Sequence, residues 1–227
     1  MTCLVTRSHS WARRICAGYL AKFSSTPRIS SLQTTIARDL RLRQQHWDVG
    51  SLLQEAVSEC LYVAFEPDPA TFATLRRNVY QNHLSDAELH SVAIGDHSGQ
   101  IELFRDPSPE SSSLRMSTLR QRHDGPSVAV QLRRLSDFIR SDIDLLKIDV
   151  EGAEDAALGD LAGSGKLRYA KHLHLEYHHH IDASADKLSS MLRLIEENGF
   201  GYQLRAIAKP WPVEASFQDI SIYCYRK

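Results

Sequence analysis

The sequence contains no apolar run as long as a membrane-spanning helix, so we expect no membrane span in this chain. It also lacks a G-x-G-x-x-G turn ahead of Glu66, which a nicotinamide-dependent oxidoreductase would need. Its four cysteines show no Cys-x-x-Cys spacing, and Cys60 and Cys224 stand in apolar, strand-like segments. Buried, reduced thiols are the simpler interpretation of that pattern, and they favour a reducing, cytoplasmic location.

Acidic residues are almost missing from the first 46 residues, which hold eight Lys or Arg and one acid. The remaining residues hold 27 acids and 19 bases, and this acidic body disfavours a nucleic-acid partner. The basic, Ser- and Thr-rich residues 1–46 suit an organelle transit peptide, and a disordered or loosely helical extension fits them equally well. We expect a basic extension over residues 1–46 and one folded domain over residues 47–227.

Apolar periodicity after residue 47 indicates an α/β fold. The continuous apolar run at 61–65 predicts a strand covered on both faces, and Asp68-Pro69 marks a helix start. Only a Pro-rich turn separates the last two predicted strands, so they should pair antiparallel. We predict a Rossmann-like, mostly parallel sheet with helices on both faces and a C-terminal antiparallel hairpin. Further strands are expected at 88–94, 100–104, 128–132, 144–150, 172–177, 202–207 and 220–225, and further helices at 51–59, 135–140, 153–161 and 188–195.

Carboxylates end three of the predicted strands. Glu66 follows the first apolar run, Asp149 lies at the end of the strand at 144–150, and Glu176 lies near the end of the next strand. Because the carboxyl ends of parallel strands meet at one edge, this pattern suggests a nucleoside-type cofactor there. Lys147 precedes Asp149 by two residues, and we interpret it as a lysine that pairs with a neighbouring acid.

An ordered series of short motifs resembles the FkbM-type methyltransferases, within the class I S-adenosylmethionine-dependent enzymes. The series covers roughly residue 48 to the C-terminus, and its most specific piece is Lys-Ile-Asp-Val-Glu-Gly-Ala-Glu at 147–154. The resemblance implies S-adenosyl-L-methionine as cofactor and O-methylation of a hydroxyl on a small-molecule acceptor, a sugar or secondary metabolite. The other matching segments are Tyr-Val-Ala-Phe-Glu-Pro-Asp-Pro at 62–69, Asn-Val-Tyr-Gln-Asn at 78–82, Ser-Val-Ala-Ile-Gly-Asp at 91–96, Ser-Ser-Leu at 112–114 and Leu-Glu-Tyr-His at 175–178.

The sequence departs from the family pattern at its start. The family opens with a strand ending in Asp-Val-Gly, followed by Ala-Asn-x-Gly and a full helix. Here Asp48-Val49-Gly50 is followed by Ser-Leu-Leu, so the second glycine and a turn or two of helix are missing. We therefore expect a shortened first strand and a shortened cofactor loop. The alternative function is a catalytically silent, methyltransferase-like binding or scaffold domain.

The resemblance assigns a set of residues to the cofactor. Glu66 is expected to accept hydrogen bonds from both ribose hydroxyls, and the segment at 91–93 is expected to lie beside the adenine ring. Asp48 and Gly50 are expected to begin the loop that holds the methionine end of the cofactor. Glu151 could contact the cofactor's ammonium group. The structural alternatives are a helix cap for Glu66, a cap of the next helix by Glu151 or Glu154, and a plain strand end at 91–93. The assigned residues are Asp48, Gly50, Glu66, Ser91, Val92, Ala93 and Glu151.

The residues assigned to catalysis are Asp149, Glu176 and His178. One of these side chains would receive the proton of the acceptor hydroxyl during methyl transfer, and a histidine near its ordinary pKa is a reasonable base. No residue is assigned to a metal. A divalent ion held by the same three side chains stays open, but successive residues of an extended chain point to opposite sides, so His178, His179 and His180 are not a ligand set.

Overall fold

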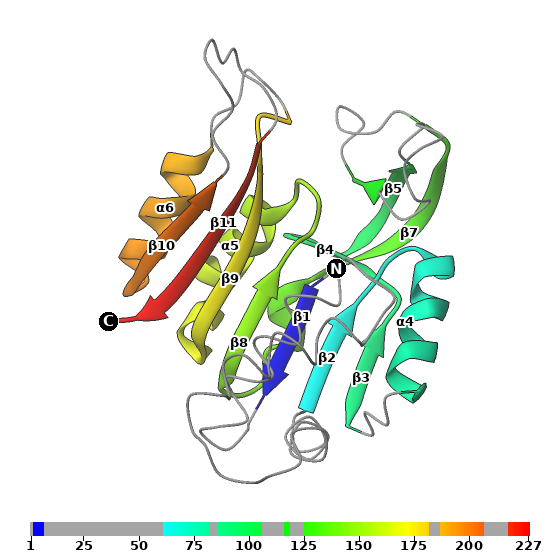
Figure 1. Cartoon of the computed structure of the whole chain (residues 1–227), viewed down its shortest axis with the longest axis horizontal. Helices are drawn as coiled ribbons and strands as arrows, with labels where there is room; N and C mark the ends of the chain where they lie inside the picture. Colours follow the sequence, from blue (N-terminus) through cyan, green and yellow to red (C-terminus); the bar gives the residue numbers. More distant parts are fainter. Residues whose placement is uncertain are drawn as a thin grey trace, which may run out of the picture.

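The computed structural model describes residues 2–6, 61–81, 86–105, 116–118, 125–181, 187–206 and 218–227. Within these ranges the chain forms a seven-stranded sheet, a separate four-stranded sheet and three α-helices (Figure 1). Asp48, Gly50 and the helix predicted at 51–59 lie outside the described residues. In the described part of the chain, no helix has the length and apolarity needed to cross a membrane.

The larger sheet has the predicted mixed architecture. In spatial order its strands are β10 (Phe200–Ala206), β11 (Gln218–Arg226), β9 (Ala170–His179), β8 (Ile143–Ile148), β1 (Thr2–Thr6), β2 (Leu61–Phe65) and β3 (Ala87–His90). Strands β2, β3, β8, β9 and β10 run in one direction, and β1 and β11 run in the other. The final two strands pair antiparallel from Phe200↔Arg226 to Ala206↔Ile220, which confirms the predicted C-terminal hairpin.

Strand β1 was not anticipated from the sequence. It comes from the segment expected to be a basic extension, and it lies between β2 and β8, antiparallel to both. Its first residue, Thr2, pairs with Phe65 at the end of β2, so the chain begins at the carboxyl edge of the neighbouring parallel strands (Figure 1). This strand is therefore an interior strand of the sheet, next to the central strand β8. The domain boundary at residue 46 stays a prediction.

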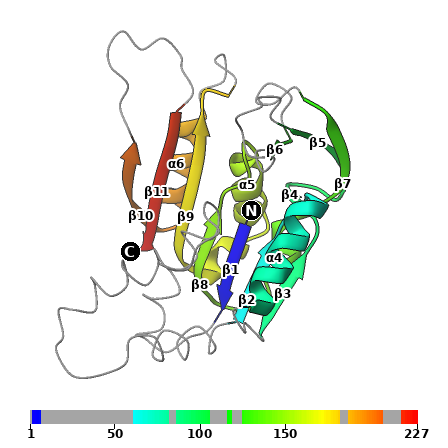
Figure 2. The ribbon, with the colours of Figure 1, turned by 45° about the vertical axis from the view of Figure 1, so that its right-hand side comes forward.

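Helices cover both faces of the larger sheet, as predicted. Helix α4 (Pro69–Gln81) connects β2 to β3, and α5 (Glu154–Gly163) connects β8 to β9. These two crossovers run in opposite directions along the sheet, and right-handed crossovers of opposite direction place their helices on opposite faces. Figure 2 shows α4 on one face, and α5 and α6 (Leu188–Glu197) on the other. The predicted start of α4 is confirmed, because the Asp68 carboxylate accepts a hydrogen bond from the Thr71 N–H at 2.9 Å.

The main hydrophobic core lies between the sheet and the face that carries α5 and α6. Leu146 and Ile148 of β8 and Leu173 and Leu175 of β9 are almost completely buried there, with Leu158 of α5. Burying each such side chain contributes about 1.5–3 kcal/mol relative to leaving it exposed. Since side chains alternate along a strand, the polar residues between these apolar ones must point to the opposite face or to the edge of the sheet. This alternation sets the direction of the candidate site residues.

The smaller sheet corrects the prediction of one continuous strand at 88–94. The chain leaves β3 after His90 and begins β4 (Ala93–Gly95) in the other sheet, because Ala93 packs with Leu103, Val130 and Leu132 in a separate core. The helix predicted at 135–140 is a single 3-10 turn, η1 (Leu135–Phe138). The remaining strands of the smaller sheet are β5 (Gly99–Arg105), β6 (Met116–Ser117) and β7 (Ser127–Arg134).

Candidate active site

The carboxyl ends of β2, β8 and β9 lie at the same edge of the larger sheet (Figure 1). Glu66 follows β2, Asp149 follows β8, and Glu176 lies near the end of β9. Ile148 pairs with Leu175, so the next residues of both strands, Asp149 and Glu176, lie side by side. Glu66 lies at the same edge, with β1 between its strand and β8.

A buried lysine links the acids of β8 and β9. Lys147 is only 2% exposed, and its Nζ lies 2.8 Å from Asp149 Oδ2 and 3.6 Å from Glu176 Oε2. The predicted pairing of Lys147 with a neighbouring acid is confirmed. A buried charge requires such compensation, because an uncompensated ion in a protein interior is strongly destabilising.

The two carboxyl groups beside Lys147 differ in basicity. Burial acts to raise the pKa of Asp149, but the positive amino terminus of the chain and Lys147 outweigh it and lower this pKa to about 2. The pKa of Glu176 is raised, first by burial and then by the negative charge of Asp149, against the opposing charge of Lys147. Asp149 is therefore a fixed anion at neutral pH, and Glu176 is the stronger proton acceptor of the pair.

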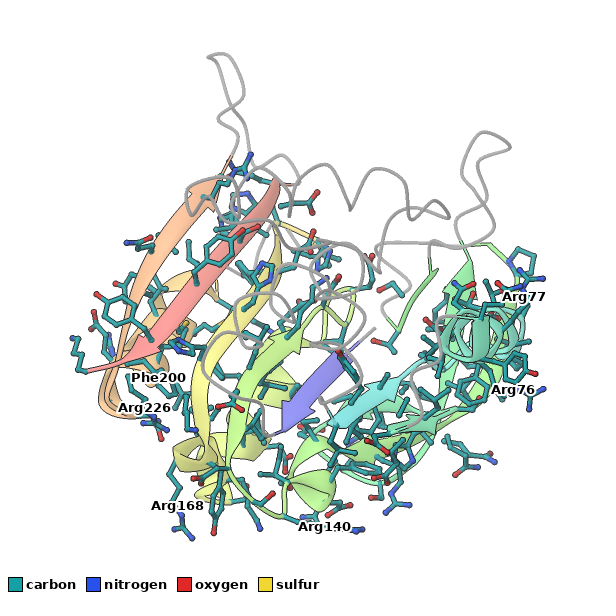
Figure 3. All side chains as sticks on the ribbon, turned by 60° about the horizontal axis from the view of Figure 1, so that its bottom comes forward. Arg76, Arg77, Arg140, Arg168, Phe200 and Arg226 are labelled. Carbon is teal, nitrogen blue, oxygen red and sulfur yellow. The ribbon has the colours of Figure 1, made fainter. Side chains whose placement is uncertain are left out.

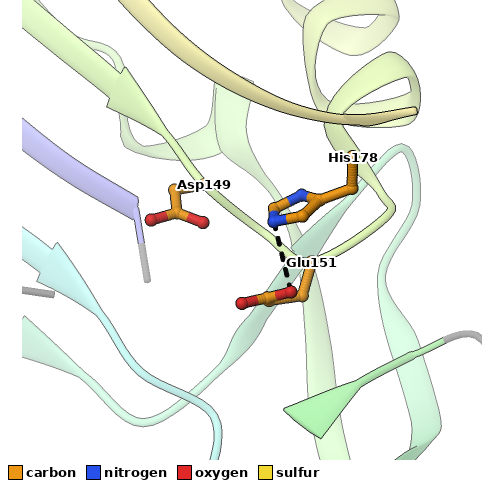
Figure 4. A group of neighbouring side chains, drawn as sticks. All are labelled: Asp149, Glu151 and His178. Carbon is orange, nitrogen blue, oxygen red and sulfur yellow. Dashed lines mark ion pairs between the residues drawn. The ribbon is translucent and has the colours of Figure 1, made fainter. Parts of the chain in front are cut away.

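Three carboxylates lie within 4 Å of the imidazole of His178, those of Glu151, Glu154 and Asp219. Figure 4 shows the histidine with Glu151 and Asp149. Its Nδ1 lies 2.8 Å from Oε1 of Glu154, and both side chains are almost fully buried. Its Nε2 lies 3.2 Å from Oε2 of Glu151 and 3.8 Å from Oδ1 of Asp219. The histidine thus connects the turn after β8, the start of α5 and strand β11.

The turn after β8 sets the positions of the Glu151 and Glu154 carboxylates. Glu151 has a φ of +55° and Gly152 a φ of +111°, the second of which strongly favours glycine. The Glu154 carboxylate turns back from the first residue of α5 and accepts the N–H groups of Val150 (3.3 Å) and Gly152 (3.0 Å). Ser117 of β6 donates its hydroxyl to the Glu151 carbonyl, which ties the turn to the smaller sheet. The turn is therefore held by side chains as well as by its backbone.

Glu66 lies in a second part of the same edge. Its Oε1 accepts the Asp68 N–H at 3.0 Å, which is the capping contact expected from the structural alternative. Its own N–H donates to the carbonyl of His90 at 3.0 Å, which brings the end of β2 beside the end of β3. Burial raises the pKa of the Glu66 carboxyl, and the positive amino terminus opposes this effect. The Glu66 carboxylate thus accepts a structural hydrogen bond from Asp68 and also lies at the edge of the sheet where a ligand could bind.

The segment at 91–93, which is expected to lie beside an adenine ring, is close to Glu66. Ser91 and Val92 directly follow β3, whose last residue accepts the Glu66 N–H. The side chain of Ala93 is 4% exposed and packs in the core of the smaller sheet. At position 93, only the backbone could therefore meet a ligand.

A family model described as Methyltransferase FkbM domain matches residues 48–202. The chain belongs to the FkbM methyltransferase family. This FkbM chain is 34% identical over 112 residues to Methyltransferase 1 of Beauveria bassiana (strain ARSEF 2860), an alignment that covers 40% of this chain and 45% of the Beauveria protein. It therefore spans less than half the length of that relative.

Two crystal structures are similar to the FkbM chain. One is the methyltransferase FkbM from Methylobacillus flagellatus KT, with 20% identity, a TM-score of 0.43, and coverage of 72% of this chain and 36% of that chain. The other is the precorrin-6y C5,15-methyltransferase from Geobacter metallireducens GS-15, with 14% identity, a TM-score of 0.36, and coverage of 73% and 66%.

Among the residues that the structure describes, one group of side chains could hold a metal. Asp149, Glu151 and His178 each offer one donor atom, and these atoms lie within 4.8 Å of one another. Carboxylate oxygens and an imidazole nitrogen suit several divalent cations. The group differs from the set considered from the sequence, because Glu151 takes the place of Glu176. The same oxygens also suit a protonated imidazole at His178.

The sequence did not predict that Glu154 contacts His178 in the site. Its position at the start of a predicted helix favoured a capping role, and it does accept two N–H groups of the preceding turn. Its contact with His178 joins residues 24 positions apart, and no local pattern indicates such a contact. The available signal was composition, since Glu154 is the third acid in the family's most specific motif, after Asp149 and Glu151.

Proposed function

We propose that this chain is an S-adenosyl-L-methionine-dependent methyltransferase that methylates a hydroxyl group of a small molecule, a sugar or secondary metabolite. The observation that carries the proposal is the gathering of Glu66, Asp149 and Glu176 at one edge of the sheet in a chain of the FkbM family. Ligands of open α/β sheets bind outside the carboxyl ends of the strands. The acidic edge lies at that position.

The residues proposed to bind the cofactor would contact different parts of it along this edge of the sheet. Glu66 would receive the ribose hydroxyls, and Ser91, Val92 and the backbone of Ala93 would face the adenine ring. Glu151 would meet the ammonium group at the methionine end, where Asp48 and Gly50 are also proposed to act. When bound, the cofactor supplies a methyl group already activated by a sulfonium. The protein then has to align the acceptor oxygen and take up its proton.

Glu176 is the residue best suited to take up that proton. Its raised pKa makes it a stronger base than Asp149, and its side chain is one-third exposed, so an acceptor can reach it. Lys147 holds Asp149 as an anion beside it, which keeps the edge negative around the reacting hydroxyl. General-base help of this kind typically contributes about 10²–10⁴-fold to a rate.

Calorimetry with S-adenosylhomocysteine tests the cofactor part of the proposal. We expect saturable binding by the full chain and a loss of about 10- to 100-fold in affinity for Glu66→Ala, because two charge-assisted hydrogen bonds disappear. The control is Glu88→Ala, which removes a half-exposed acid of the neighbouring strand β3. Undetectable binding by folded wild-type protein contradicts the proposal, as does equal loss in both variants.

A catalytically silent binding or scaffold domain is the second candidate. It is favoured by β1, which lies antiparallel between β2 and β8 and begins at the acidic edge. The positive amino terminus opposes the effect of burial at both acids, but the pKa of Glu66 is still raised and only that of Asp149 is lowered. Failure of S-adenosylhomocysteine to bind would favour this candidate.

A further inference from the structure

The backbone of Glu151 has an uncommon conformation. Its φ of +55° lies in the left-handed region, which is unfavourable for a residue that carries a side chain. Glycine adopts a positive φ without this penalty, as Gly152 does at the next position with a φ of +111°. The turn after β8 therefore places a carboxylate at a position where the backbone favours glycine, and other contacts must hold it there.

Hydrogen bonds hold this turn at three successive residues. The Glu154 carboxylate accepts the N–H groups of Val150 and Gly152. Between them, the carbonyl of Glu151 accepts the hydroxyl of Ser117, a residue 34 positions earlier in the chain. Ser117 is completely buried, so water does not compete for its hydroxyl. This bond therefore acts directly on the residue with the unfavourable conformation.

The smaller sheet sets the position of Ser117. Ser117 pairs with Phe104 of β5, and β5 pairs along its length with β7. Leu103 of β5 packs with Val130 and Leu132 of β7 in the core of the smaller sheet. The hydroxyl thus reaches the turn from a different sheet than β8, the strand that the turn follows. A packed element outside the turn therefore fixes one of the groups that hold it.

The Glu151 carboxylate is the more accessible of the two acids that follow β8. The side chain of Glu151 is 31% exposed, and that of Asp149 is 10% exposed. The backbone conformation at residue 151 sets the direction of its side chain, so relaxation to a negative φ would turn the carboxylate away from its present position. We propose that Ser117 is a positioning residue, whose hydroxyl holds Glu151 in the left-handed conformation and so directs its carboxylate to the ammonium group of the cofactor. This role rests on the proposed function.

A double-mutant cycle on S-adenosylhomocysteine affinity of the full chain tests the route through Glu151. We expect Ser117→Ala to weaken binding about five- to tenfold in the wild-type chain, because residue 151 can then relax to a negative φ. The same change should have little further effect in Glu151→Ala, which has no carboxylate left to position. Equal losses of affinity in both backgrounds would show that Ser117 does not act through Glu151 and would overturn the proposal.

Ser136→Ala is the matched control for the loss of a buried hydroxyl. Ser136 of η1 is also buried, and its hydroxyl donates to Oδ1 of Asp160 in α5 at 2.8 Å. Both serine variants lose a buried hydrogen bond, so both should unfold at a lower urea concentration than wild type. Only Ser117→Ala should also lose affinity. Equal loss of affinity in the two variants would mean that binding follows stability alone, which contradicts a positioning role.

Amide hydrogen exchange of the unliganded chain, followed by NMR, tests the contact without the cofactor. In Ser117→Ala the N–H of Gly152 should exchange about tenfold faster than in wild type, because opening of the turn breaks its bond to Glu154. Ser136→Ala should leave this rate close to that of wild type. An unchanged rate in Ser117→Ala would show that the hydroxyl does not hold the turn. Absence of S-adenosylhomocysteine binding by wild type would end the positioning role together with the proposed function, while the exchange rate would still decide whether Ser117 holds the turn.

Glycine at position 151 separates the backbone conformation from the carboxylate. Glu151→Gly removes the side chain that disfavours a positive φ, so the double variant with Ser117→Ala should recover slow exchange of the Gly152 N–H. It should not recover affinity for S-adenosylhomocysteine, because the carboxylate is gone. Exchange as fast as in Ser117→Ala alone would show that the hydroxyl does not act through the left-handed conformation of residue 151. Recovered affinity would show that the Glu151 carboxylate is not the group being positioned, and either result would overturn the proposal.

Discussion

Replacing Lys147 with methionine should destabilise the protein by about 3–5 kcal/mol at neutral pH, the usual cost of breaking a buried ion pair from one side. Methionine has a similar length and an apolar end, so it fills the volume of the lysine without supplying a charge. The carboxylate of Asp149, 2.8 Å away in the wild type, would then remain buried without its nearest cation. Urea denaturation followed by circular dichroism measures the free energy of unfolding.

The pH dependence of this loss carries the sharper test. In the wild type the pKa of Asp149 is lowered to about 2, so its contribution is present above the unfolded value, about 3.9, and is lost as the pH falls from there towards 2. Without Lys147 this pKa should rise, because the charge and the hydrogen bond of the lysine no longer oppose burial. The deficit of Lys147→Met should therefore shrink as the pH falls from 7 towards 4, because Asp149 takes up a proton.

The double variant Lys147→Met with Asp149→Asn is the control. It removes both charges, so it should recover much of the stability lost in the single variant and should lose the extra pH dependence. A single variant within about 1 kcal/mol of wild type at neutral pH would contradict a tightly coupled buried pair, since only exposed pairs contribute so little. A deficit that is constant with pH would show that Asp149 is not the group affected.

The strands and helices that the sequence predicted well are those with local signals. The apolar run of β2, the Asp68-Pro69 start of α4 and the Asn-Gly end of α6 each depend on a few neighbouring residues. The antiparallel final hairpin followed from a short connection, which leaves no room for a crossover helix. The gathering of acids at one edge followed from the parallel strands that carry them.

What could not be predicted depends on distant partners. Strand β1 is a short segment within a basic head, and its place between β2 and β8 is set by residues about 60 and 140 positions later. The division of residues 88–94 between two sheets depends on a second core that local periodicity does not reveal. Strand formation reflects packing against neighbours more than the intrinsic preference of the segment.

In the site, too, the residue types could be predicted from the sequence, but their ionisation could not. Asp149 and Glu176 look alike in the sequence, and both were assigned to catalysis. Their pKa values move in opposite directions for different reasons. At Asp149 the amino terminus and Lys147, 2.8 Å away, outweigh burial, whereas burial and the charge of Asp149 raise the pKa of Glu176, which lies 3.6 Å from Lys147. Residue types can be read from a sequence, but the ionisation that separates an anion from a base depends on burial and exact neighbours.

The second large effect is expected at Arg226, near the C-terminus. Its guanidinium lies 3.9 Å from the centre of the Phe200 ring and donates to the carbonyls of Leu167, Ala170 and Asn198 (Figure 3). These carbonyls belong to η2 (Lys166–Tyr169), the start of β9 and the turn after α6. One side chain thus joins three segments at the edge of the sheet opposite the acids.

Arg226→Ala should lower the free energy of unfolding by about 2–4 kcal/mol, because three charge-assisted hydrogen bonds and the ring contact are lost together. Arg226→Lys should recover only part of this loss, since an ammonium cannot reproduce the planar fork that reaches three carbonyls. Arg168→Ala is the control, because that guanidinium contacts the neighbouring Tyr169 on the surface and its removal should cost about 0.5 kcal/mol or less. Equal losses for Arg226→Ala and Arg168→Ala in urea denaturation would mean that water replaces the guanidinium at all three carbonyls, and that the hairpin β10–β11 is held to α6 by its apolar contacts alone.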